Sequence, residues 1–407
     1  MELTKLLALL AFATAWWLSP SPTSSAAGPG LCSSLNNHTD CYFSEGYWEA
    51  RSKFRRAAAA AGAELHTLAV VPGGDYTTDV AVLAGGGQGL MIHSIGVHGV
   101  EGYAGSAVQL ALLERLAREP DKAAGDAPTV VLVHAVNPFG MAHFRRWNEH
   151  NVDLNRNALL PGRAWEEVLA RDPNVAGYFD FTAFINPQRA PSLFDAYVRI
   201  PVVMAYHVLR FGMLHMKRAL VAAQYTDPTG LFYGGAELEP SWRLLWDFLE
   251  RFDGGSYKGV TWVDVHTGLG RSGGDTLLTS AGWEEMERRY PGAGAVQDES
   301  AGEGDVGGGY ELTRGFCREL MQHRFAPEAR LQHFSQEFGT LPGVLVARAM
   351  VLENQAWNYA QREQAYWASF TRDAFYVRTP AWKESIVRRG VLVAEQAMAR
   401  AQEVAKE

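Results

Sequence analysis

The sequence has no block of lysine and arginine, no long apolar run and only three cysteines. Because its formal net charge is −8 and no basic patch stands out, nucleic acid is not an expected partner. The apolar leader Leu6–Leu18 is too short to span a bilayer. No repeat or linker divides the chain, and a hydrophobic fraction of 47% allows a large buried core. We therefore expect one globular unit without a stable membrane span in its mature form.

The leader has the pattern of a secretory signal. Lys5 precedes the apolar run, and small residues follow it up to a cleavage point near Ala27. We therefore expect a signal peptide at 1–27, one domain at 28–407 and a secreted or extracytoplasmic protein. Glu2 departs from the basic start of such signals, and a leader that is not a signal would leave the protein in the cytoplasm.

The expected state of the cysteines follows from that location. Cys32 and Cys41 flank Asn37, which begins an Asn-His-Thr acceptor pattern for N-glycosylation. In a secreted chain we expect a short Cys32–Cys41 disulfide, with Cys317 left as a buried free thiol. In a chain that is not exported, all three cysteines would be reduced and packed.

Alternating strand and helix patterns predict an α/β fold. Apolar runs predict buried strands at 90–97 and 129–136, and apolar residues at helical spacing predict a helix at 102–118 between them. Strand, helix and strand in this order form a parallel βαβ unit. Further strands are predicted at 65–71, 77–83, 260–268 and 331–338, and further helices at 47–61, 191–223, 241–251, 343–366 and 380–407.

The stretch His98-Gly99-Val100-Glu101 follows the strand at 90–97. Ligands of α/β sheets gather where strands end, and an imidazole and a carboxylate three residues apart can bind the same divalent ion. Catalytic zinc takes three protein ligands and keeps one position for water. A pattern this short also arises by chance. In that case Glu101 would stabilise the N-terminus of the following helix through the helix dipole, and His98 would be a structural residue packed in the protein interior.

Other polar residues follow or end predicted strands. His266 ends the strand at 260–268 and supplies a third ligand by that placement, not by local spacing. The polar block from Arg145 to Asn157 either carries function, since arginine forks suit carboxylates and oxyanions, or is a solvated loop. Glu337 lies late in the strand at 331–338, where a buried carboxylate must be paired or catalytic.

Four segments, taken in order, resemble the zinc carboxypeptidase superfamily and, more closely, a little-characterised branch of it made up mainly of proteins of unknown function. The segments are His98-Gly99-Val100-Glu101, the block from Asn137-Pro138-Phe139-Gly140 to Asn155-Arg156-Asn157, Asp264-Val265-His266-Thr267-Gly268, and Gln336-Glu337-Phe338-Gly339-Thr340. The similarity runs from about Cys41 to Tyr366. It implies a single carboxypeptidase-like α/β domain with a mixed, mostly parallel twisted sheet, helices on both faces and a site at the C-terminal ends of the strands.

The resemblance also implies roles at the metal. His98, Glu101 and His266 would hold one zinc ion, and Glu337 would be the general base. Asp153 would orient His98 through a hydrogen bond, as metal-bound imidazoles generally require.

The remaining candidates would contact the substrate. By the same resemblance, Asn155 and Arg156 would bind its terminal carboxylate, and Arg145 or Arg146 would stabilise the oxyanion. The tyrosine that caps the substrate in the family has no secure match, and Tyr310 is the candidate. The long segment after Arg156 exceeds the common carboxypeptidase pattern and would reshape the cleft.

Together these residues predict a zinc-dependent hydrolase that cleaves an amide bond next to a free carboxylate, as a metallocarboxypeptidase acting on peptides. One alternative is a deacylase of N-acyl amino acids, resembling aspartoacylase or succinylglutamate desuccinylase, which share the His-x-x-Glu, Asn-Arg and third-His features. Another is a binding protein that kept the pocket without catalysis. A Gly-x-Ser-x-Gly pattern, as in serine hydrolases, occurs at 270–274, but no predicted helix follows it. We therefore interpret this match as accidental. The oligomeric state does not follow from the sequence.

Overall fold

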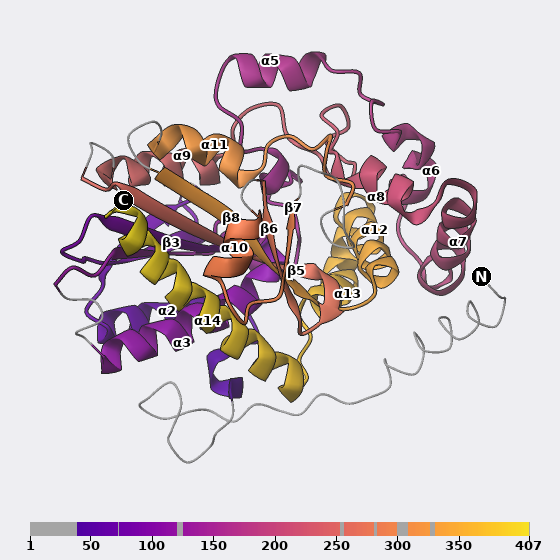
Figure 1. The fold of residues 1–407 in the computed structure, drawn as a ribbon. Coiled ribbons are helices and arrows are strands. Elements are labelled where there is room, and N and C mark those ends of the chain that lie inside the picture. The colour runs from indigo at the N-terminus through magenta and orange to yellow at the C-terminus, as the bar shows by residue number, and fades with distance from the viewer. Residues whose placement is uncertain are drawn as a thin grey trace.

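The computed structural model describes residues 39–71, 73–119, 125–252, 256–280, 283–298, 308–325 and 330–406. An 8-stranded sheet runs through this part of the chain, and helices cover both of its faces (Figure 1). The expected α/β fold is therefore confirmed. The signal peptide expected at 1–27, the acceptor Asn37 and the Cys32 half of the expected disulfide lie outside the described residues. Cys317 is a buried free thiol.

The strands lie side by side in the order β1-β2-β4-β3-β5-β8-β6-β7. Their bounds are β1 (Glu64–Ala69), β2 (Thr77–Leu83), β3 (Gly89–Ile95), β4 (Thr129–His134), β5 (Gly259–Ser272), β6 (Asp275–Thr279), β7 (Ala295–Asp298) and β8 (Arg330–Gly339). The central strands β4, β3, β5 and β8 are parallel, whereas β1, β2 and β6 have antiparallel partners. Strands β3 and β4 and the helix α3 (Gly102–Arg118) between them form the predicted βαβ unit.

The register of the sheet brings the ends of its central strands to one edge. Ser94 in β3 pairs with Asp264 in β5, and two residues later His266 in β5 pairs with Glu337 in β8. Residues that pair in register place their side chains on the same face of a sheet. The carboxyl ends of β3, β5 and β8 therefore gather the residues that the sequence predicts at the site.

Two helical layers enclose the sheet. On one face lie α2 (Tyr47–Ala60), α3 and α14 (Pro380–Val404), and on the other lie α5 (Arg163–Ala170), α9 (Pro240–Leu249) and α11 (Cys317–Phe325). Ala81 and Met91 pack in the first core, and Val80 and Ile92 pack in the second. Because successive strand residues point to opposite faces, each strand contributes to both cores.

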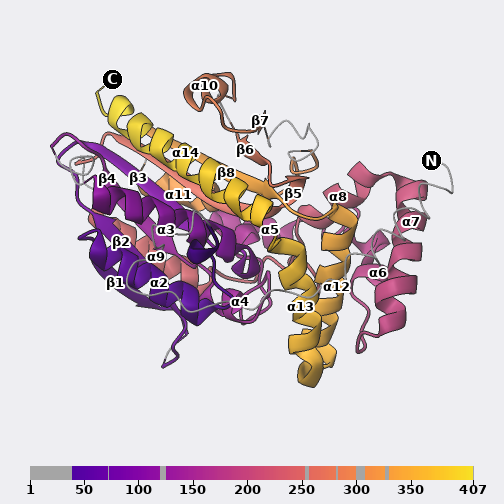
Figure 2. The ribbon, with the colours of Figure 1, turned by 90° about the horizontal axis from the view of Figure 1, so that it is seen from below.

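A third group of helices lies beyond the carboxyl ends of the central strands (Figure 2). It contains α6 (Thr182–Ile185), α7 (Ile200–Phe211), α8 (Met213–Val221), α12 (Gly343–Tyr359) and α13 (Gln364–Phe375), and it has its own core. Between 159 and 252, as predicted, there is no regular strand, only an isolated bridge from Gln224 to Tyr233. None of the helices in the described ranges combines the length and apolarity that a bilayer crossing requires.

Short helical elements connect these layers. They are η2 (Thr39–Tyr42), η3 (Gly99–Glu101), α4 (Pro138–Ala142), η5 (Leu154–Arg156), η6 (Tyr178–Asp180), η7 (Asp195–Arg199), η8 (Glu250–Phe252), α10 (Trp283–Arg289) and η9 (Gln361–Glu363). Two of them, η3 and η5, carry candidate site residues, and two further candidates, His266 and Glu337, lie on the strands β5 and β8.

Candidate metal centre

The turn after β3 presents His98 and Glu101. β3 ends at Ile95, and η3 follows His98 and leads directly into α3. Gly99 has no room for a side chain, because a Cβ at this position would lie 2.2 Å from the carbonyl carbon of Gly140. The close approach of these two backbones therefore requires glycine between the histidine and the glutamate.

Hydrogen bonds fix the same turn to the loop that follows β4. The backbone N–H of Gly99 donates to the carbonyl oxygen of Arg146 at 3.2 Å, and that of Val100 donates to the carbonyl oxygen of Arg145 at 2.8 Å. The polar block predicted at 145–157 therefore lies at the same sheet edge as His98.

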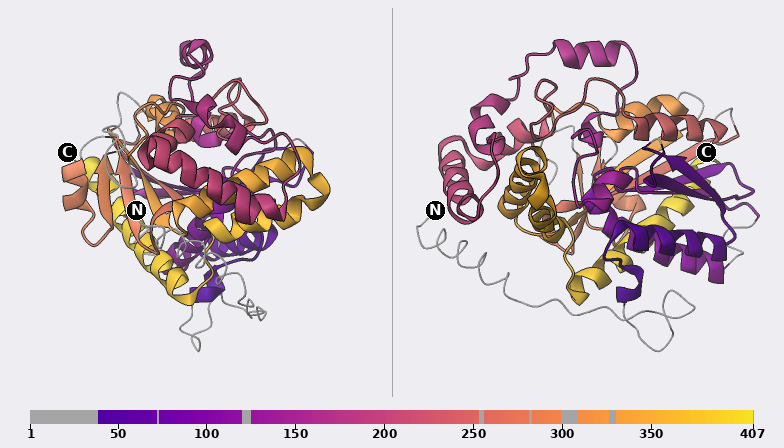
Figure 3. Two further views of the ribbon diagram at one scale, coloured as in Figure 1. Left: turned by 90° about the vertical axis from the view of Figure 1, so that its right-hand side faces the viewer. Right: turned by 180° about the vertical axis from the view of Figure 1, so that it is seen from behind.

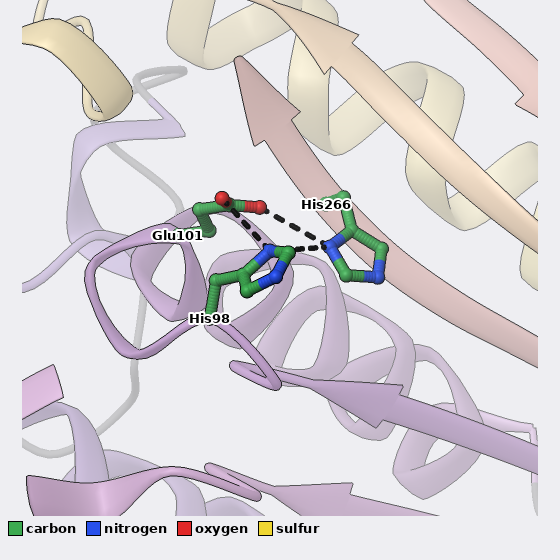
Figure 4. A group of neighbouring side chains, drawn as sticks. All are labelled: His98, Glu101 and His266. Atoms are coloured by element: carbon green, nitrogen blue, oxygen red, sulfur yellow. Dashed lines mark hydrogen bonds and ion pairs between the residues drawn. The ribbon is translucent and has the colours of Figure 1, made fainter. Parts of the chain in front are cut away.

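Three side chains converge at this edge: His98, Glu101 and His266 (Figure 4). One potential ligand atom from each lies within 4.8 Å of the other two. The Nδ1 atoms of the two imidazoles are 3.2 Å apart; His98 Nδ1 lies 3.0 Å from Glu101 Oε1, and His266 Nδ1 lies 3.2 Å from Glu101 Oε2. The structure thus brings together two residues, Glu101 and His266, that are 165 positions apart.

A carboxylate lies against the outer nitrogen of each imidazole. His98 Nε2 is 2.9 Å from Asp153 Oδ1, and His266 Nε2 is 2.8 Å from Asp264 Oδ2. A proton on each Nε2 leaves each Nδ1 lone pair facing the centre, which is the arrangement that metal-binding histidines use. The resemblance implies Asp153 in this position, whereas the sequence motifs assigned no role to Asp264. Its signal is its position two residues before His266, on the same face of β5.

Asp264 is itself held in place, which makes its role testable. Its Oδ1 accepts a hydrogen bond of 2.7 Å from Ser94 Oγ, and Trp262 Nε1 donates to the same hydroxyl at 2.8 Å. We expect Asp264→Asn to weaken zinc binding by about 10- to 100-fold, because an amide holds the imidazole less firmly. Competition with a chromophoric chelator measures the affinity. Asp79→Asn, a change at a buried carboxylate in β2, is the control, and equal affinities would contradict the role of Asp264.

Of the two arginines that the sequence could not distinguish, Arg146 faces the site. Its Nη1 donates to Glu101 Oε1 at 2.8 Å and its Nε donates to Asp153 Oδ2 at 3.3 Å. Burial would lower the pKa of Arg146, but Asp153 and Glu101 outweigh burial and raise it, so the guanidinium stays charged. Arg146 therefore places a cation between the two acids that flank His98.

Arg145 points away from the site. Its side chain is fully buried, its Nε donates to Glu353 Oε1 at 2.7 Å, and its guanidinium lies 3.8 Å from the centre of the Trp357 ring. It does not line the cavity that His98 and Glu101 face. Arg145 therefore joins the polar loop to α12 and has no contact with the candidate ligands.

We expect Arg145→Met to destabilise the protein without a direct effect on the site. Glu353 would then be a buried charge without its cationic partner, and breaking such a pair typically costs about 3–5 kcal/mol. The midpoint of chemical unfolding measures the loss. Arg145→Met combined with Glu353→Leu removes both charges and should recover part of it. Unchanged stability in the single variant would contradict this structural role.

Glu337 lies beside His266 on the neighbouring strand. Its side chain is partly exposed and lines the cavity, and its Oε1 accepts a hydrogen bond of 2.9 Å from the backbone N–H of Leu269. Burial, and then the charge of Glu101, raise the pKa of Glu337, although His266 opposes this. Glu337 thus combines a fixed position with an increased affinity for protons.

A cavity of about 500 Å³ opens onto these groups. Its polar wall includes His98, Glu101, Arg146, His266 and Glu337. Its opposite wall is apolar and comes from α7, α8 and α12, with the side chains of Met204, Met213, Met216, Leu220, Val346 and Met350. The long segment after Arg156 therefore forms part of the cavity wall.

The predicted substrate-binding residues also line this cavity: Asn155, Arg156 and Tyr310. Arg156 is held by two backbone carbonyls, since its Nε donates to that of Val221 at 2.7 Å and its Nη1 to that of Asn155 at 2.6 Å. Its Nη2 has no hydrogen-bond acceptor among the described residues. The Tyr310 ring lies 5.9 Å from the Arg156 guanidinium. A rigid, cationic fork therefore lies in the cavity wall.

The charges around the centre favour a bound cation. Burial would raise the pKa of Glu101, but His98, His266 and Arg146 outweigh burial and hold it well below its usual range. Burial likewise opposes ionisation of Asp153, whose pKa is nevertheless kept low by His98 and Arg146. Carboxylates that stay ionised beside two imidazoles form a donor set of the kind that binds zinc. The residues present therefore fit a single zinc ion.

Several solved structures resemble the chain at low identity. The metallo-carboxypeptidase from Burkholderia cenocepacia is 13% identical, with 83% of this chain and 69% of that chain covered and a TM-score of 0.38. Carboxypeptidase A from Helicoverpa armigera is 12% identical, with 91% and 81% covered and a TM-score of 0.41. Bovine thrombin-activatable fibrinolysis inhibitor, in complex with tick carboxypeptidase inhibitor, is 12% identical, with 84% and 97% covered and a TM-score of 0.41. At this level of likeness an activity does not follow.

No curated protein matches the chain. A family described as "Protein of unknown function (DUF2817)" matches residues 43–389, which is most of the sequence and contains every candidate site residue named above. The chain therefore belongs to the DUF2817 family of proteins of unknown function.

Proposed function

We propose that this protein is a zinc-dependent hydrolase that cleaves an amide bond next to a free carboxylate, as a metallocarboxypeptidase that releases C-terminal amino acids. The observation that carries the proposal is the convergence of His98, Glu101 and His266 beside Glu337 in one cavity. Two imidazoles and one carboxylate are the protein ligands of several catalytic zinc sites. Asp153 and Asp264, which contact the outer nitrogens of the two imidazoles, also support metal binding. Metal-binding histidines generally have a partner of this kind on the nitrogen that does not bind the metal.

Zinc held by these three residues would act as a Lewis acid and lower the pKa of a bound water to about 7. Glu337 would take a proton from the attacking water as the new bond to the carbonyl carbon forms. It would then give that proton to the leaving amine as the carbon–nitrogen bond breaks. A raised pKa suits this exchange, because the carboxyl group must both accept and release a proton near neutral pH.

Arg146 would stabilise the negative charge that develops on the carbonyl oxygen. Arg146 lines the cavity and stays charged, whereas Arg145 forms a buried ion pair with Glu353. The loss of one donor of this kind typically lowers the rate by about 10²- to 10³-fold. The role that the sequence left open between two arginines is therefore proposed for Arg146 alone.

Arg156 and Asn155 would select the end of the chain by binding its α-carboxylate. A guanidinium binds a carboxylate through two parallel hydrogen bonds, which lysine cannot reproduce. We expect Arg156→Lys to lower kcat/KM for peptides with a free C-terminus by about 10- to 100-fold, the value of one charged hydrogen bond. Peptides with an amidated C-terminus, measured in the same assay, should show no comparable loss. An equal loss on both kinds of peptide would contradict selection by Arg156.

The proposal is tested by elemental analysis of the purified protein and a screen of peptides against N-acyl amino acids. Stoichiometric zinc and release of C-terminal residues would support the carboxypeptidase. Zinc with cleavage of N-acyl amino acids alone would instead identify the deacylase, built on the same site. Zinc without cleavage of either class would leave a binding protein and overturn the proposed activity.

A further inference from the structure

The outer side of η7, α7 and α8 is apolar although it faces solvent. Among the described residues, 16 large apolar side chains are exposed, and ten of them lie in the short segment 193–214. We call these ten side chains the outer apolar face: Leu193, Phe194, Tyr197, Val198, Val202, Tyr206, Leu209, Phe211, Met213 and Leu214. Single exposed apolar residues are ordinary on protein surfaces, but a cluster of this size marks a contact surface.

The spacing of most of these residues follows one side of the helical segment formed by η7 and α7, and Met213 and Leu214 begin α8 after a break at Gly212. Phe194, Val198, Val202 and Tyr206 recur every four residues, and Leu209 follows three residues later. The opposite side of the same helices, with Ala196, Ile200 and Met204, is buried in the third core. Helix α7 is therefore apolar on both sides, whereas a surface helix normally turns polar residues outward.

The outer apolar face lies at the edge of the molecule, where an extended surface could reach it. Helix α7 is at the end of the molecule in Figure 2, and in the left view of Figure 3 it lies in front of the other elements. Val202 is 59% exposed and Leu209 is 73% exposed. Met213 both belongs to this face and lines the cavity, so the face extends to the cavity wall.

The segment that carries this face is positively charged in an otherwise acidic chain. From Phe181 to Thr226 the sequence contains five lysines or arginines and one acid, Asp195, so its formal charge is +4 while the whole chain has −8. Asp195 is buried and paired with Arg189 and Arg199. Arg218 pairs with Glu311, and Lys217 lines the cavity with its Nζ 4.9 Å from the centre of the Tyr310 ring. Arg210 is exposed beside the apolar side chains.

We propose that the outer apolar face binds the surface of a lipid bilayer that carries anionic head groups. Apolar and aromatic side chains with basic residues beside them are the features of helices that lie in a membrane interface. Helix α7 has only 12 residues, and such a helix lies on a bilayer without crossing it. Basic residues near the surface add an attraction to anionic lipids.

Charge favours a bilayer over the other possible occupants. A symmetric dimer through this face would bring the same basic segment of two copies together, and neither copy has an acid between residues 196 and 226 to pair with Arg210 of the other. The apolar leader Leu6–Leu18 would add apolar contacts but no negative charge. Anionic lipid head groups supply the negative charge that neither a second copy of this face nor the leader provides. The inference does not depend on the proposed hydrolase activity.

Flotation of the full-length protein with vesicles tests the proposal. The vesicles contain phosphatidylcholine alone or phosphatidylcholine mixed with phosphatidylglycerol. We expect stronger binding to the mixed vesicles, weakened by added salt, and a loss of about 10-fold or more in the double variant Val202→Glu and Leu209→Glu. Leu169→Glu is the matched control, because Leu169 is an exposed leucine (48%) on α5, outside the face, and its substitution should change nothing. Circular dichroism checks that each variant is folded.

Sedimentation and a fluorescent label separate the alternatives. An absence of binding to mixed vesicles, or equal binding by the double variant, would overturn the proposal. A dimer that dissociates in the double variant would assign the face to a second copy instead. An environment-sensitive label at Leu209→Cys should shift to an apolar signal only when vesicles are added. The same signal without vesicles would show that the face is already covered by another part of the chain, and would also overturn the proposal.

Discussion

Glu337→Gln should lower kcat by about 10²- to 10⁴-fold, the usual contribution of a general base, while stoichiometric zinc stays bound. Glutamine has nearly the same shape, and its side-chain oxygen can still accept the hydrogen bond from the Leu269 backbone. It cannot take up a proton, so the attacking water is no longer activated. Because Glu337 is not one of the three converging ligands, the metal should be retained. Steady-state kinetics and elemental analysis of the same sample measure both effects.

A buried glutamate outside the cavity provides the control for this substitution. Glu239 is 7% exposed and accepts hydrogen bonds from the Asn148 amide and the His150 ring, outside the cavity. Glu239→Gln should leave kcat unchanged. A fully active Glu337→Gln variant would remove Glu337 from the mechanism, and a loss of zinc from that variant would make it a ligand and not the base.

His266→Ala should lose the metal. With one of three ligands removed, the fall in zinc affinity should exceed the about 10- to 100-fold that loss of an outer hydrogen-bonding partner costs. The substitution also leaves Asp264 without the imidazole that it orients. Elemental analysis after dialysis measures the bound zinc, and activity should disappear with it.

Two outcomes of this experiment separate a ligand from a merely structural histidine. His143 is a partly buried histidine at the end of α4, outside the cavity, and His143→Ala should keep its zinc. Stoichiometric zinc in His266→Ala would reject His266 as the third ligand. Added zinc should raise the melting temperature of the unsubstituted protein, because it binds only the folded chain, and should not raise that of His266→Ala.

The sequence predicted the central part of the fold because its signals there are local and strong. The helix predicted at 102–118 has the bounds of α3, and the buried strands at 90–97 and 129–136 correspond to β3 and β4. Strand ends then indicated that His98 and His266 lie at one edge, and their Nδ1 atoms are 3.2 Å apart. Parallel pairing makes this possible, because it fixes which ends of distant strands meet.

The edge of the sheet beyond β8 could not be predicted in the same way. Strands β6 and β7 have five and four residues, too few for a clear alternating pattern, and a glycine directly precedes each. The helices α10 and α11 are also short, with seven and nine residues. Elements of this length are decided by tertiary packing, which leaves little trace in local sequence.

The directions of the side chains in the polar loop could not be predicted from the sequence either. Arg145 and Arg146 are adjacent and chemically identical, yet one pairs with Glu353, 208 residues away, and the other with Glu101. Only the packed structure determines which guanidinium is buried in the core. The role of Asp264 could have been predicted, because residues two positions apart in a strand lie on the same face of the sheet, and Asp264 is two positions from His266.

The hydrogen bonds from Gly99 and Val100 to the carbonyls of Arg146 and Arg145 have a consequence for assembly of the centre. The turn that carries Glu101 and the loop that carries Arg146 are joined by these backbone hydrogen bonds, so the position of each depends on the other. If these hydrogen bonds opened, Glu101 and Arg146 would be displaced together, and metal affinity would fall. Amide exchange at Gly99 and Val100 should therefore slow when zinc is added, and it would report on formation of the whole centre.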